Sequence, residues 1–515
     1  MAQRASKAQQ GSIESLSLKF DGGLNLSEAP SNIADNELTR AYNYIYDAAT
    51  GTPIVRPGTT CQTAATCDST WPILKICNYE KSSAESWLVA VCNGNLYYLS
   101  GAGLDGWTKI GALNDVTTIP CFLTFHAKLL IADGGTNIKT WDGTTYSALA
   151  DGLAATAITA IKGRVVVNST TAGSNDLVTF SGPEDETKWN TATEGAVALR
   201  AGFGDNMRVN GFAVFGDDII VSKKGDSEKR LYRINISDAT TTNWTVSSLN
   251  ENNCSVSPHT IVSAFNNVFF ADTNGFKSLK GVTEYGDLQV DFSNAKMNPY
   301  FTSGTNCHEM VYIPYFSAIW FSISEHVYAF HNLIDPQGNT ITAFTEMAFA
   351  QGLIKSICQV DENTVYMAGN NGYLYKVDLT DAIGTDETAP GVTATFTATL
   401  QTKEFPFFGG GILRRCEIYL KPLLSGNAYL YAGTTRSEGV LIKAITLRNK
   451  ADFLYDATGY LYDATEFLHD MGKTPWYELS RNRTRGGSIQ FKLTSTSGRV
   501  GVEGMKAEVA LVEGD

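Results

Sequence analysis

The sequence predicts an all-β protein: a β-propeller of about six blades with an N-terminal anchoring arm and a C-terminal antiparallel, sandwich-like β domain. Three observations support this prediction. The chain is rich in glycine (47), tyrosine (23) and phenylalanine (25), a composition that favours strands and turns over helices. Short Val, Ile, Thr, Tyr and Phe runs alternate with turn residues. A hairpin pattern also returns at a nearly regular spacing, which is typical of repeat architectures.

Length and composition limit the class of protein. The chain has 515 residues, of which 43% are hydrophobic and 18% charged, so it has room for about two to four folded domains. Its net charge is -13, from 40 basic and 53 acidic residues, which argues against a protein that grips DNA or an anionic membrane. A net negative charge is compatible with a channel through which DNA passes, because a channel wall that does not bind phosphate lets the DNA slide.

Cysteines and apolar runs indicate the cellular compartment. Nine cysteines are spread along the chain without a C-x-x-C pair, a pattern that predicts reduced thiols made in a cytosol. The first twelve residues contain no apolar core of a signal peptide. No run of about 18 apolar residues follows. We therefore expect neither a secretory signal nor a membrane-spanning segment.

The segment F-D-G-G-L-N-L-S-E-A-P, residues 20–30, raises the question of a phosphate loop. A phosphate loop needs a helix N-terminus directly after the glycines, whereas an extended, proline-ended stretch follows here. A short helix is expected later, capped by Asp35, with Leu38, Tyr42 and Ile45 on one face. Gly22 and Gly23 are therefore interpreted as flexible backbone points in an anchoring arm.

Between about residues 70 and 380 a strand, a Gly or Asn turn and an aromatic-rich strand recur. Successive hairpins start roughly 40 to 55 residues apart, close to the length of a four-stranded propeller blade. Six blades is the preferred count and seven the alternative. The hairpin segments are 87–99, 129–143, 163–190, 217–234, 266–279, 318–330 and 363–378.

The propeller pattern ends at I-G-T-D-E-T-A-P-G, which is typical of a linker. Alternating segments at 393–402, 415–423, 427–433 and 487–496 then predict an antiparallel domain, most simply a sandwich. The expected division is an arm with a short helix at 1–58, a propeller at 59–382, a linker at 383–392 and a C-terminal β domain at 393–515.

Several motifs are similar to cofactor-binding, metal-binding or catalytic motifs but lack the context that such sites need. G-A-G-L-D-G, residues 101–106, matches the dinucleotide-binding fingerprint, but a strand start follows it instead of a helix, which favours a hairpin turn. C-H-E at 307–309 and H-V-Y-A-F-H at 326–331 offer metal ligands without zinc-type spacing, so packing or loop histidines are expected. No G-x-S-x-G elbow is present. We expect no catalytic residue, cofactor or metal site.

Two sequence features near the C-terminus each allow more than one interpretation. Three seven-residue units at 454–474 bring Asp456, Asp463 and Asp470 into register, as an ion ladder or as an ordinary hairpin or helical stripe. R-N-R-T-R-G-G at 481–487 is the densest basic patch. It faces acidic protein or passing DNA, or it is a solvated loop.

Residues 20–59 resemble the N-terminal segment of phage tail β-propeller proteins. The shared elements, in order, are G-G-L-N, a proline, D-N-E-L, a Tyr- and Asn-rich stretch and R-P-G. V-T-F-S-G-P-E-D-E-T-K-W at 178–189 and V-F-F-A-D-T-N-G-F-K-S-L at 268–279 are similar to the same family. The chain is most similar to tail hub or nozzle proteins of short-tailed bacteriophages, and a siphophage-type tail component is a further possibility.

This resemblance implies a virion structural protein of the tail, synthesised in the host cytoplasm, without catalytic residues. It implies a ring of the protein with itself, a homohexamer, below the portal and adaptor rings. Further implied partners are tail fibre or spike proteins and a plug or needle protein, with viral DNA passing transiently and without specific binding. The residues assigned to anchoring and assembly are Gly22, Gly23, Asn25, Pro30, Asp35, Leu38, Arg56, Pro57 and Gly58.

The alternative function is a carbohydrate-active propeller enzyme or a tail protein that binds host polysaccharide. A-D-G-G-T-N-I-K-T-W at 132–141 is similar to the aspartate-box turns of sialidases. Those turns are structural even in sialidases, which also need an arginine cluster and a tyrosine nucleophile. The sequence alone does not place such groups in space.

Overall fold

The computed structural model describes residues 13–100, 106–151, 153–202, 204–205, 207–226, 228–281, 288–291, 295–301, 307–380, 383–434, 437–447, 476–480, 485–496 and 498–511. In this part of the chain strands dominate, which confirms the all-β class. The helices in the same residues are short: η1 (Thr241–Asn243), η2 (Ala295–Met297), α1 (Asn298–Phe301) and η3 (Pro314–Phe316). None of them has the length and apolar character that crossing a bilayer requires.

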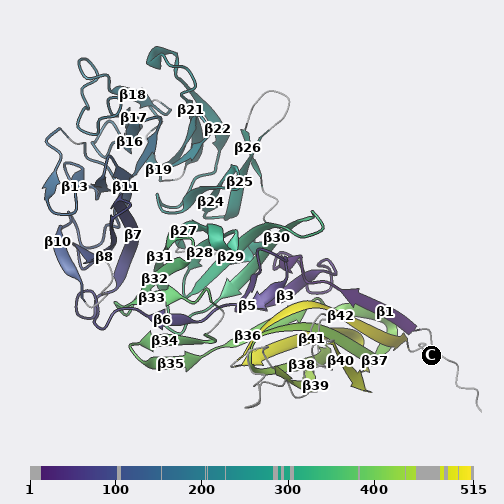
Figure 1. Ribbon diagram of the computed structural model, residues 1–515. Helices are drawn as coiled ribbons and strands as arrows, with labels where there is room; N and C mark the ends of the chain where they lie inside the picture. Colours follow the sequence, from purple (N-terminus) through teal and green to yellow (C-terminus); the bar gives the residue numbers. More distant parts are fainter. Residues whose placement is uncertain are drawn as a thin grey trace, which may run out of the picture.

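Seven four-stranded antiparallel units in the described residues form a β-propeller (Figure 1). Blade one contains β7 (Ile73–Ser82), β8 (Glu85–Cys92), β9 (Asn95–Ser100) and β10 (Thr108–Ala112). Blade two contains β11 (Cys121–Phe125), β12 (Lys128–Ala132), β13 (Lys139–Trp141) and β14 (Tyr146–Ala148). Blade three contains β15 (Ile158–Ile161), β16 (Arg164–Asn168), β17 (Leu177–Phe180) and β18 (Val197–Arg200).

The second half of the propeller continues the same order. Blade four contains β19 (Arg208–Phe215), β20 (Asp218–Lys224), β21 (Lys229–Asn235) and β22 (Thr245–Glu251). Blade five contains β23 (Ile261–Ala264), β24 (Asn267–Asp272), β25 (Gly275–Gly281) and β26 (Leu288–Asp291). Blade six contains β27 (Cys307–Ile313), β28 (Ala318–Ile323), β29 (His326–Ile334) and β30 (Thr340–Met347). Blade seven begins with β31 (Ile354–Asp361), β32 (Thr364–Gly369) and β33 (Leu374–Val377).

Blade seven takes its fourth strand from the start of the chain. β6 (Thr59–Cys61) pairs antiparallel with β33, with Cys61 opposite Tyr375 and Thr59 opposite Val377. The first strands of neighbouring blades contact one another around the ring, and β31 contacts β7 to close it. The described residues therefore form seven blades, the alternative count, and not the preferred six, because residues 59–61 complete a blade that starts about 300 residues later.

Apolar side chains from neighbouring blades fill the space between them. In β20, Ile219 and Val221 pack against blade three, whereas Ile220 packs against blade five. All three side chains are fully buried. Successive residues of a strand point to opposite faces, so a strand covered on both faces needs a continuous apolar run. The short apolar runs of the sequence are explained by this packing.

The C-terminal part is a two-layered β domain, as predicted. Its strands are β36 (Thr397–Thr402), β37 (Phe405–Leu424), β38 (Gly426–Thr434), β39 (Ser437–Leu447), β40 (Trp476–Ser480), β41 (Arg485–Thr496) and β42 (Arg499–Leu511). β41 pairs with β36 and β38 in one layer and with β37 in the other. Leu430 and Leu493 from the first layer share a buried core with Ile418 and Val502 from the second.

The N-terminal segment lies between the propeller and the C-terminal domain (Figure 1). It contains β1 (Ile13–Leu18), β2 (Gly23–Leu24), β3 (Glu37–Tyr42), β4 (Tyr44–Tyr46) and β5 (Pro53–Val55). β1 and β5 pair with β42, and β3 lies between β30 and β36. Because of β3, blade six and the C-terminal domain belong to one continuous 16-stranded sheet.

Two local predictions were wrong. The helix expected after Asp35 is strand β3, because Leu38 and Ala41 are buried between two sheet neighbours whose ladders satisfy the backbone. The linker expected at 383–392 contains β34 (Thr385–Ala389), which pairs with β6, and most of the turn to β35 (Val392–Thr395). This segment extends the sheet of blade seven and is not a free connection.

Some predicted features lie outside the described residues. These are the repeat at 454–474 with Asp456, Asp463 and Asp470, residues 481–484 of the basic patch, and residues 101–105 of G-A-G-L-D-G. The strand expected after that glycine motif is present as β10, which pairs antiparallel with β9. This pairing agrees with a hairpin and not with a dinucleotide-binding turn.

Candidate assembly site at the junction of the two domains

Strand β3 joins the two domains. Leu38 and Tyr42 stand opposite Thr402 and Thr399 of β36, in antiparallel register. On its other side β3 meets β30 through Tyr42 and Glu346. β2 runs parallel to the start of β3. The predicted site residues between 22 and 38 are therefore placed around a strand that both domains share.

Gly22 and Gly23 are needed for close approach and not for flexibility. The Gly22 N–H donates to the Asn36 carbonyl at 3.0 Å, and a Cβ on Gly22 would lie 2.9 Å from the same oxygen. Gly23 has a φ of +67°, and a Cβ there would lie 2.6 Å from the backbone nitrogen of Phe344. The interpretation as flexible points of an arm is corrected: blade six packs directly on this backbone.

Asn25 and Glu37 hold the turn between β2 and β3. The Asn25 amide donates to Glu37 Oε2 at 2.8 Å, and Lys296 Nζ lies 2.7 Å from Glu37 Oε1. Burial on its own would raise the pKa of Glu37, but the bonds from Lys296, Asn25 and the Ala34 N–H hold that pKa below its ordinary value. Glu37 is therefore an ionised anchor of the segment.

Pro30 and Asp35 contact the C-terminal domain at the surface. The Pro30 carbonyl accepts the Glu404 N–H at 2.9 Å. Asp35 Oδ1 lies 2.8 Å from Lys403 Nζ, and its side chain is 75% exposed. Asp35 caps no helix, contrary to the prediction, and forms an exposed ion pair.

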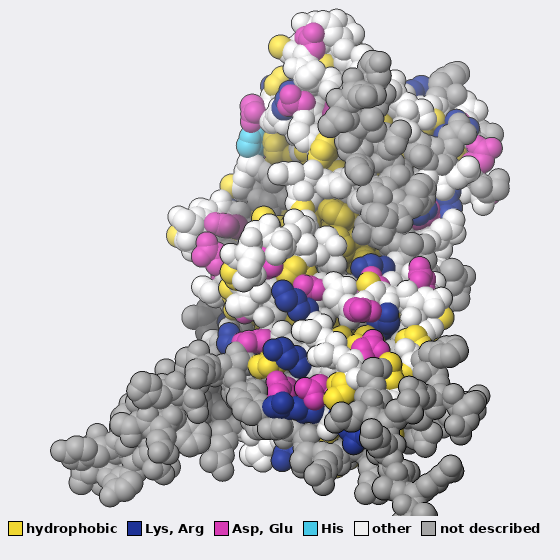
Figure 2. Space-filling view, turned by 90° about the vertical axis from the view of Figure 1, so that its right-hand side faces the viewer, with side chains coloured by type: hydrophobic (Ala, Val, Ile, Leu, Met, Phe, Trp, Pro, Cys, Tyr) yellow, Lys and Arg dark blue, Asp and Glu magenta, His cyan; other side chains and the backbone are white. Residues whose placement is uncertain are grey.

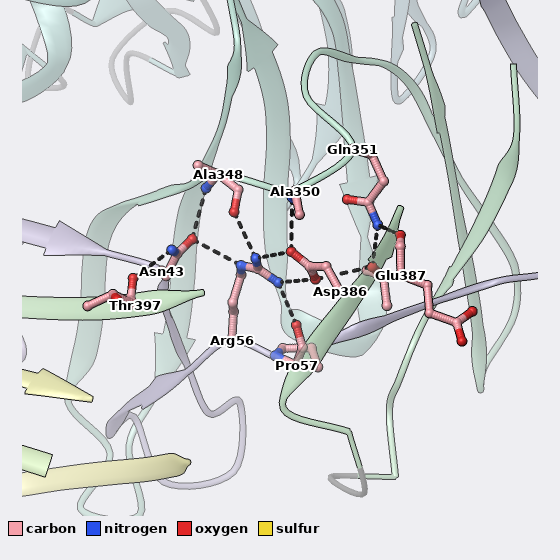
Figure 3. Close-up of polar contacts among 10 residues, drawn as sticks. Asn43, Arg56, Pro57, Ala348, Ala350, Gln351, Asp386, Glu387 and Thr397 are labelled. Carbon is pink, nitrogen blue, oxygen red and sulfur yellow. Dashed lines mark hydrogen bonds and ion pairs between the residues drawn. The ribbon is translucent and has the colours of Figure 1, made fainter. Parts of the chain in front are cut away.

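Arg56 is the centre of the junction and is completely buried (Figure 3). Its guanidinium makes five hydrogen bonds, which uses all five of its N–H groups. They are Nε to Asn43 Oδ1 at 3.0 Å, Nη1 to Pro57 O at 2.9 Å and Asp386 Oδ1 at 2.9 Å, and Nη2 to Ala348 O at 2.7 Å and Asp386 Oδ2 at 2.6 Å. The ion pair with Asp386 is bidentate, the strongest geometry available to arginine.

Aromatic rings and further hydrogen bonds complete this centre. The Arg56 guanidinium carbon lies 4.2 Å from the centroid of the Phe349 ring and 3.7 Å from that of Phe396, at cation–π distance. Asp386 also accepts from Thr59 Oγ1 at 3.1 Å and from the Ala350 N–H at 3.0 Å. Both charges are thus fully hydrogen-bonded, as a buried ion pair requires.

The partners of Arg56 come from every part of the junction. Asn43 follows β3 and donates to the Thr397 carbonyl at the start of β36. Ala348 lies between blades six and seven, and Asp386 lies in β34. The Gly58 N–H donates to the Ile383 carbonyl at 2.9 Å. A Cβ on Gly58 would lie only 2.2 Å from the backbone oxygen of Thr385. The R-P-G turn therefore ties blade seven to the C-terminal domain.

Sequence reasoning assigned Arg56 to the site but missed Asn43 and Asp386. Asp386 was placed in the linker, and the signal that could have found it is the T-D-E-T stretch, which has strand-like Thr spacing around an acidic residue. An acidic side chain on a strand opposite a buried arginine is the expected partner. Asp386 lies 330 residues from Arg56 in the sequence, so no local pattern could indicate that the two residues form a pair.

Two cavities follow the inner strands of the propeller, with volumes of about 650 and 620 Å³, and Pro258 and His259 line both. Lys75 and Glu309 form an ion pair in the wall of the first. His259 Nε2 lies 3.1 Å from the Ile119 carbonyl, so it carries the proton. Burial raises the pKa of the Cys121 thiol to about 11, the reverse of what a thiolate nucleophile needs.

The metal-ligand motifs are not assembled. In the part of the chain that the structure describes, no three His, Cys, Asp or Glu side chains are placed to share an ion. His326 pairs with Glu346 at 2.9 Å, and His331 packs against the Tyr46 ring. His331 is thus a packing histidine, and His326 forms an ion pair where a packing or loop histidine was expected.

The buried histidines predict a pH dependence of stability. Burial lowers the pKa of His331 to about 3, and burial with the nearby Lys75 charge lowers that of His259 to about 3. In the unfolded chain both titrate near 6.5. Below pH 6.5 the unfolded state binds protons that the folded state does not, so stability is full above pH 6.5 and falls as the pH approaches 3.

We expect the urea midpoint to fall steadily from pH 7 to pH 4.5, with a contribution of up to about 1.4 kcal/mol per pH unit from His331. His331→Gln should flatten this slope. An unchanged slope in His331→Gln would contradict the assignment.

Comparisons with known proteins give no family. No family model matches the chain, and no curated protein matches it. The solved structures that are similar to it include two structures of YCF48. YCF48 bound to D1 peptide has 10% sequence identity and a TM-score of 0.39, and the match covers 61% of this chain and 94% of that one. YCF48 from Cyanidioschyzon merolae has 10% identity and a TM-score of 0.41, with 62% and 98% coverage.

Proposed function

We propose that the protein is a structural subunit of a bacteriophage tail, of the hub or nozzle type, that forms a ring through which the genome passes. One observation carries this proposal. The residues on which the phage-tail resemblance rests, from Gly22 to Gly58, gather at the junction of propeller and C-terminal domain. They build the connection between the two domains.

A sheet that runs through both domains suits a subunit that must keep its shape in a ring. Strand β3 pairs with both domains, and Arg56 with Asp386 fixes the same place from inside. Backbone ladders and a saturated buried ion pair resist hinge motion between domains more strongly than a polar interface does. A ring subunit that holds its shape while neighbours dock needs this property.

The surface charge supports passage of DNA without specific binding. The chain has a net charge of -13. On the face shown in Figure 2, basic side chains lie beside acidic ones and form no single basic field. Phosphate binding depends on clustered Lys and Arg. The proposed partners are neighbouring copies in the ring, an adaptor or portal ring, fibres or spikes and a plug, in the virion tail.

Electron microscopy of the purified protein mixed with tail-less particles tests the proposal. We expect ring density with six-fold symmetry at the tail vertex. Mass photometry should show the 55.8 kDa chain alone or a species of six chains. Particles that already carry complete tails are the control, because their vertex is occupied. Absence of new density at the tail vertex would overturn the assignment.

The same preparation tests the carbohydrate alternative. Incubation with capsular polysaccharide or lipopolysaccharide should leave the polymer length unchanged. Cleavage of either polymer, lost after heat unfolding of the protein, would favour a carbohydrate-active enzyme instead.

A further inference from the structure

The second cavity of the propeller, with a volume of about 620 Å³, lies where the first strands of several blades begin. Arg208 is the first residue of β19 in blade four, and His308 is the second residue of β27 in blade six. Both line the cavity, together with Ile119 from the connection that precedes β11 of blade two. Volumes of roughly 300 to 1,000 Å³ are typical of small-molecule sites, so the cavity has room for a small organic ligand.

Basic side chains reach this cavity without acidic ones. The described residues that line it include Arg208 and His308 but no Asp or Glu. Arg208 stands opposite Lys224 in the β19–β20 ladder, and like charges in this arrangement cost stability. Burial and the nearby charge of Lys355 lower the pKa of His308, so its imidazole is neutral at pH 7. This end of the propeller thus carries positive charge in a chain of net charge -13.

The carboxylates close to the cavity already have cations. Asn175 of the lining also borders a smaller pocket that contains two aspartates, and a glutamate follows His308. The ion pairs of these three acidic residues are Asp176–Arg200 at 2.6 Å, Asp205–Lys223 at 2.7 Å and Glu309–Lys75. In the part of the chain that the structure describes, no carboxylate is paired with Arg208. Its guanidinium is therefore available to an anion from outside.

Groups that bind hydroxyls lie beside Arg208. Asn210 Nδ2 donates to the Ser255 carbonyl at 2.8 Å, which leaves the side-chain oxygen of Asn210 as an acceptor. Thr170 and Asn175 line the same cavity, and their side chains have no hydrogen-bond partner among the described residues. An amide oxygen accepts from a ligand O–H but cannot bind an anionic oxygen. The lining therefore suits a ligand that carries hydroxyl groups as well as a negative charge.

We propose that this cavity binds a small hydroxylated carboxylate, the chemistry that uronic acids represent. Arg208 holds the carboxylate through two parallel N–H···O bonds, the geometry that matches a guanidinium to a carboxylate. The ligand hydroxyls bond to Asn175, Asn210 and Thr170, and His308 contributes one further donor or acceptor. This binding site goes beyond the proposed tail function and does not depend on it.

Isothermal titration calorimetry of the purified full-length chain tests the proposal with D-glucuronate, D-glucose and inorganic sulfate. We expect glucuronate to bind at one site per chain. Glucose lacks the charge and sulfate lacks the hydroxyls, so each should bind about tenfold or more weakly. Absence of glucuronate binding, or equal affinity for glucose or sulfate, would overturn the proposal.

Variants place the binding in this cavity. Arg208→Gln removes the cation at an exposed position and should weaken glucuronate binding about tenfold or more. Lys109→Gln removes an exposed cation from β10, outside the cavity, and should bind glucuronate like the wild type. The urea midpoints of both variants should match that of the wild type, which shows that they fold. Unchanged glucuronate affinity in Arg208→Gln would contradict the assignment of the site.

Competition with alginate, a polyuronate, identifies the source of the ligand. Loss of the glucuronate signal in excess alginate assigns the site to a uronic acid residue of a polymer, and an unchanged signal assigns it to the free acid. None of these measurements requires ring formation, so the binding site and the proposed function can fail separately.

Discussion

Arg56→Met should lower the free energy of unfolding by roughly 3–5 kcal/mol, because it leaves the Asp386 carboxylate buried without its cation. Asp386 has no exposed side-chain surface and would retain only the bonds from Thr59 and the Ala350 N–H. The three other bonds of the guanidinium would also be lost. The urea midpoint, followed by tryptophan fluorescence, measures the effect.

Two further variants isolate the buried charge as the cause. Arg56→Met combined with Asp386→Leu should regain part of the loss, since no unpaired charge remains in the junction. Asp35→Asn breaks the exposed Asp35–Lys403 pair in the same region and should cost less than about 1 kcal/mol. If Arg56→Met shifts the midpoint no further than Asp35→Asn, the buried pair does not hold the junction.

Deletion of residues 1–42 should abolish folding and not only assembly. The deletion removes β1, β2 and β3, and β3 lies inside the continuous sheet between β30 and β36. Leu24, Leu38 and Ala41 are almost completely buried, and their loss exposes both sheet edges and the core beneath them. We expect insoluble protein or a species that is digested rapidly by trypsin.

This expectation reverses the sequence-based one, in which the N-terminal arm served assembly alone. A deletion of residues 1–12, which leaves every described strand in place, is the control and should give soluble, protease-resistant protein. A soluble 43–515 fragment with the wild-type urea midpoint that fails to form rings would restore the original interpretation.

The local part of the fold could be predicted from the sequence. Each of the seven hairpin segments corresponds to the second and third strands of one blade, for example β8 with β9 and β32 with β33. Turn residues and strand runs close together in the chain specify such pairs. The C-terminal two-layered domain was predicted for the same reason, from period-two alternation.

The non-local part could not be predicted. β6 completes a blade whose other strands lie beyond residue 353, and β3 pairs with β36, so both depend on partners that no local pattern reveals. The segment at 35–42 has a helical spacing of apolar residues, but tertiary pairing decides its structure. Of the nine site residues, the structure explains the contacts made at the junction, and their role in ring assembly stays a prediction.

The distant partners of β3 and of β6 also set the order in which parts of the chain can fold during synthesis. The first 61 residues leave the ribosome early, but β33, the antiparallel partner of β6, begins at residue 374, and β30 and β36, the two distant partners of β3, begin at residues 340 and 397. At typical rates of about 5–20 residues per second, these strands wait roughly 15 s or longer before they can pair. Pairings this distant in sequence fold slowly. β3 can pair early with β2, and β4 with β5, but β6 and the long-range contacts of β3 must wait on the nascent chain until most of the propeller exists.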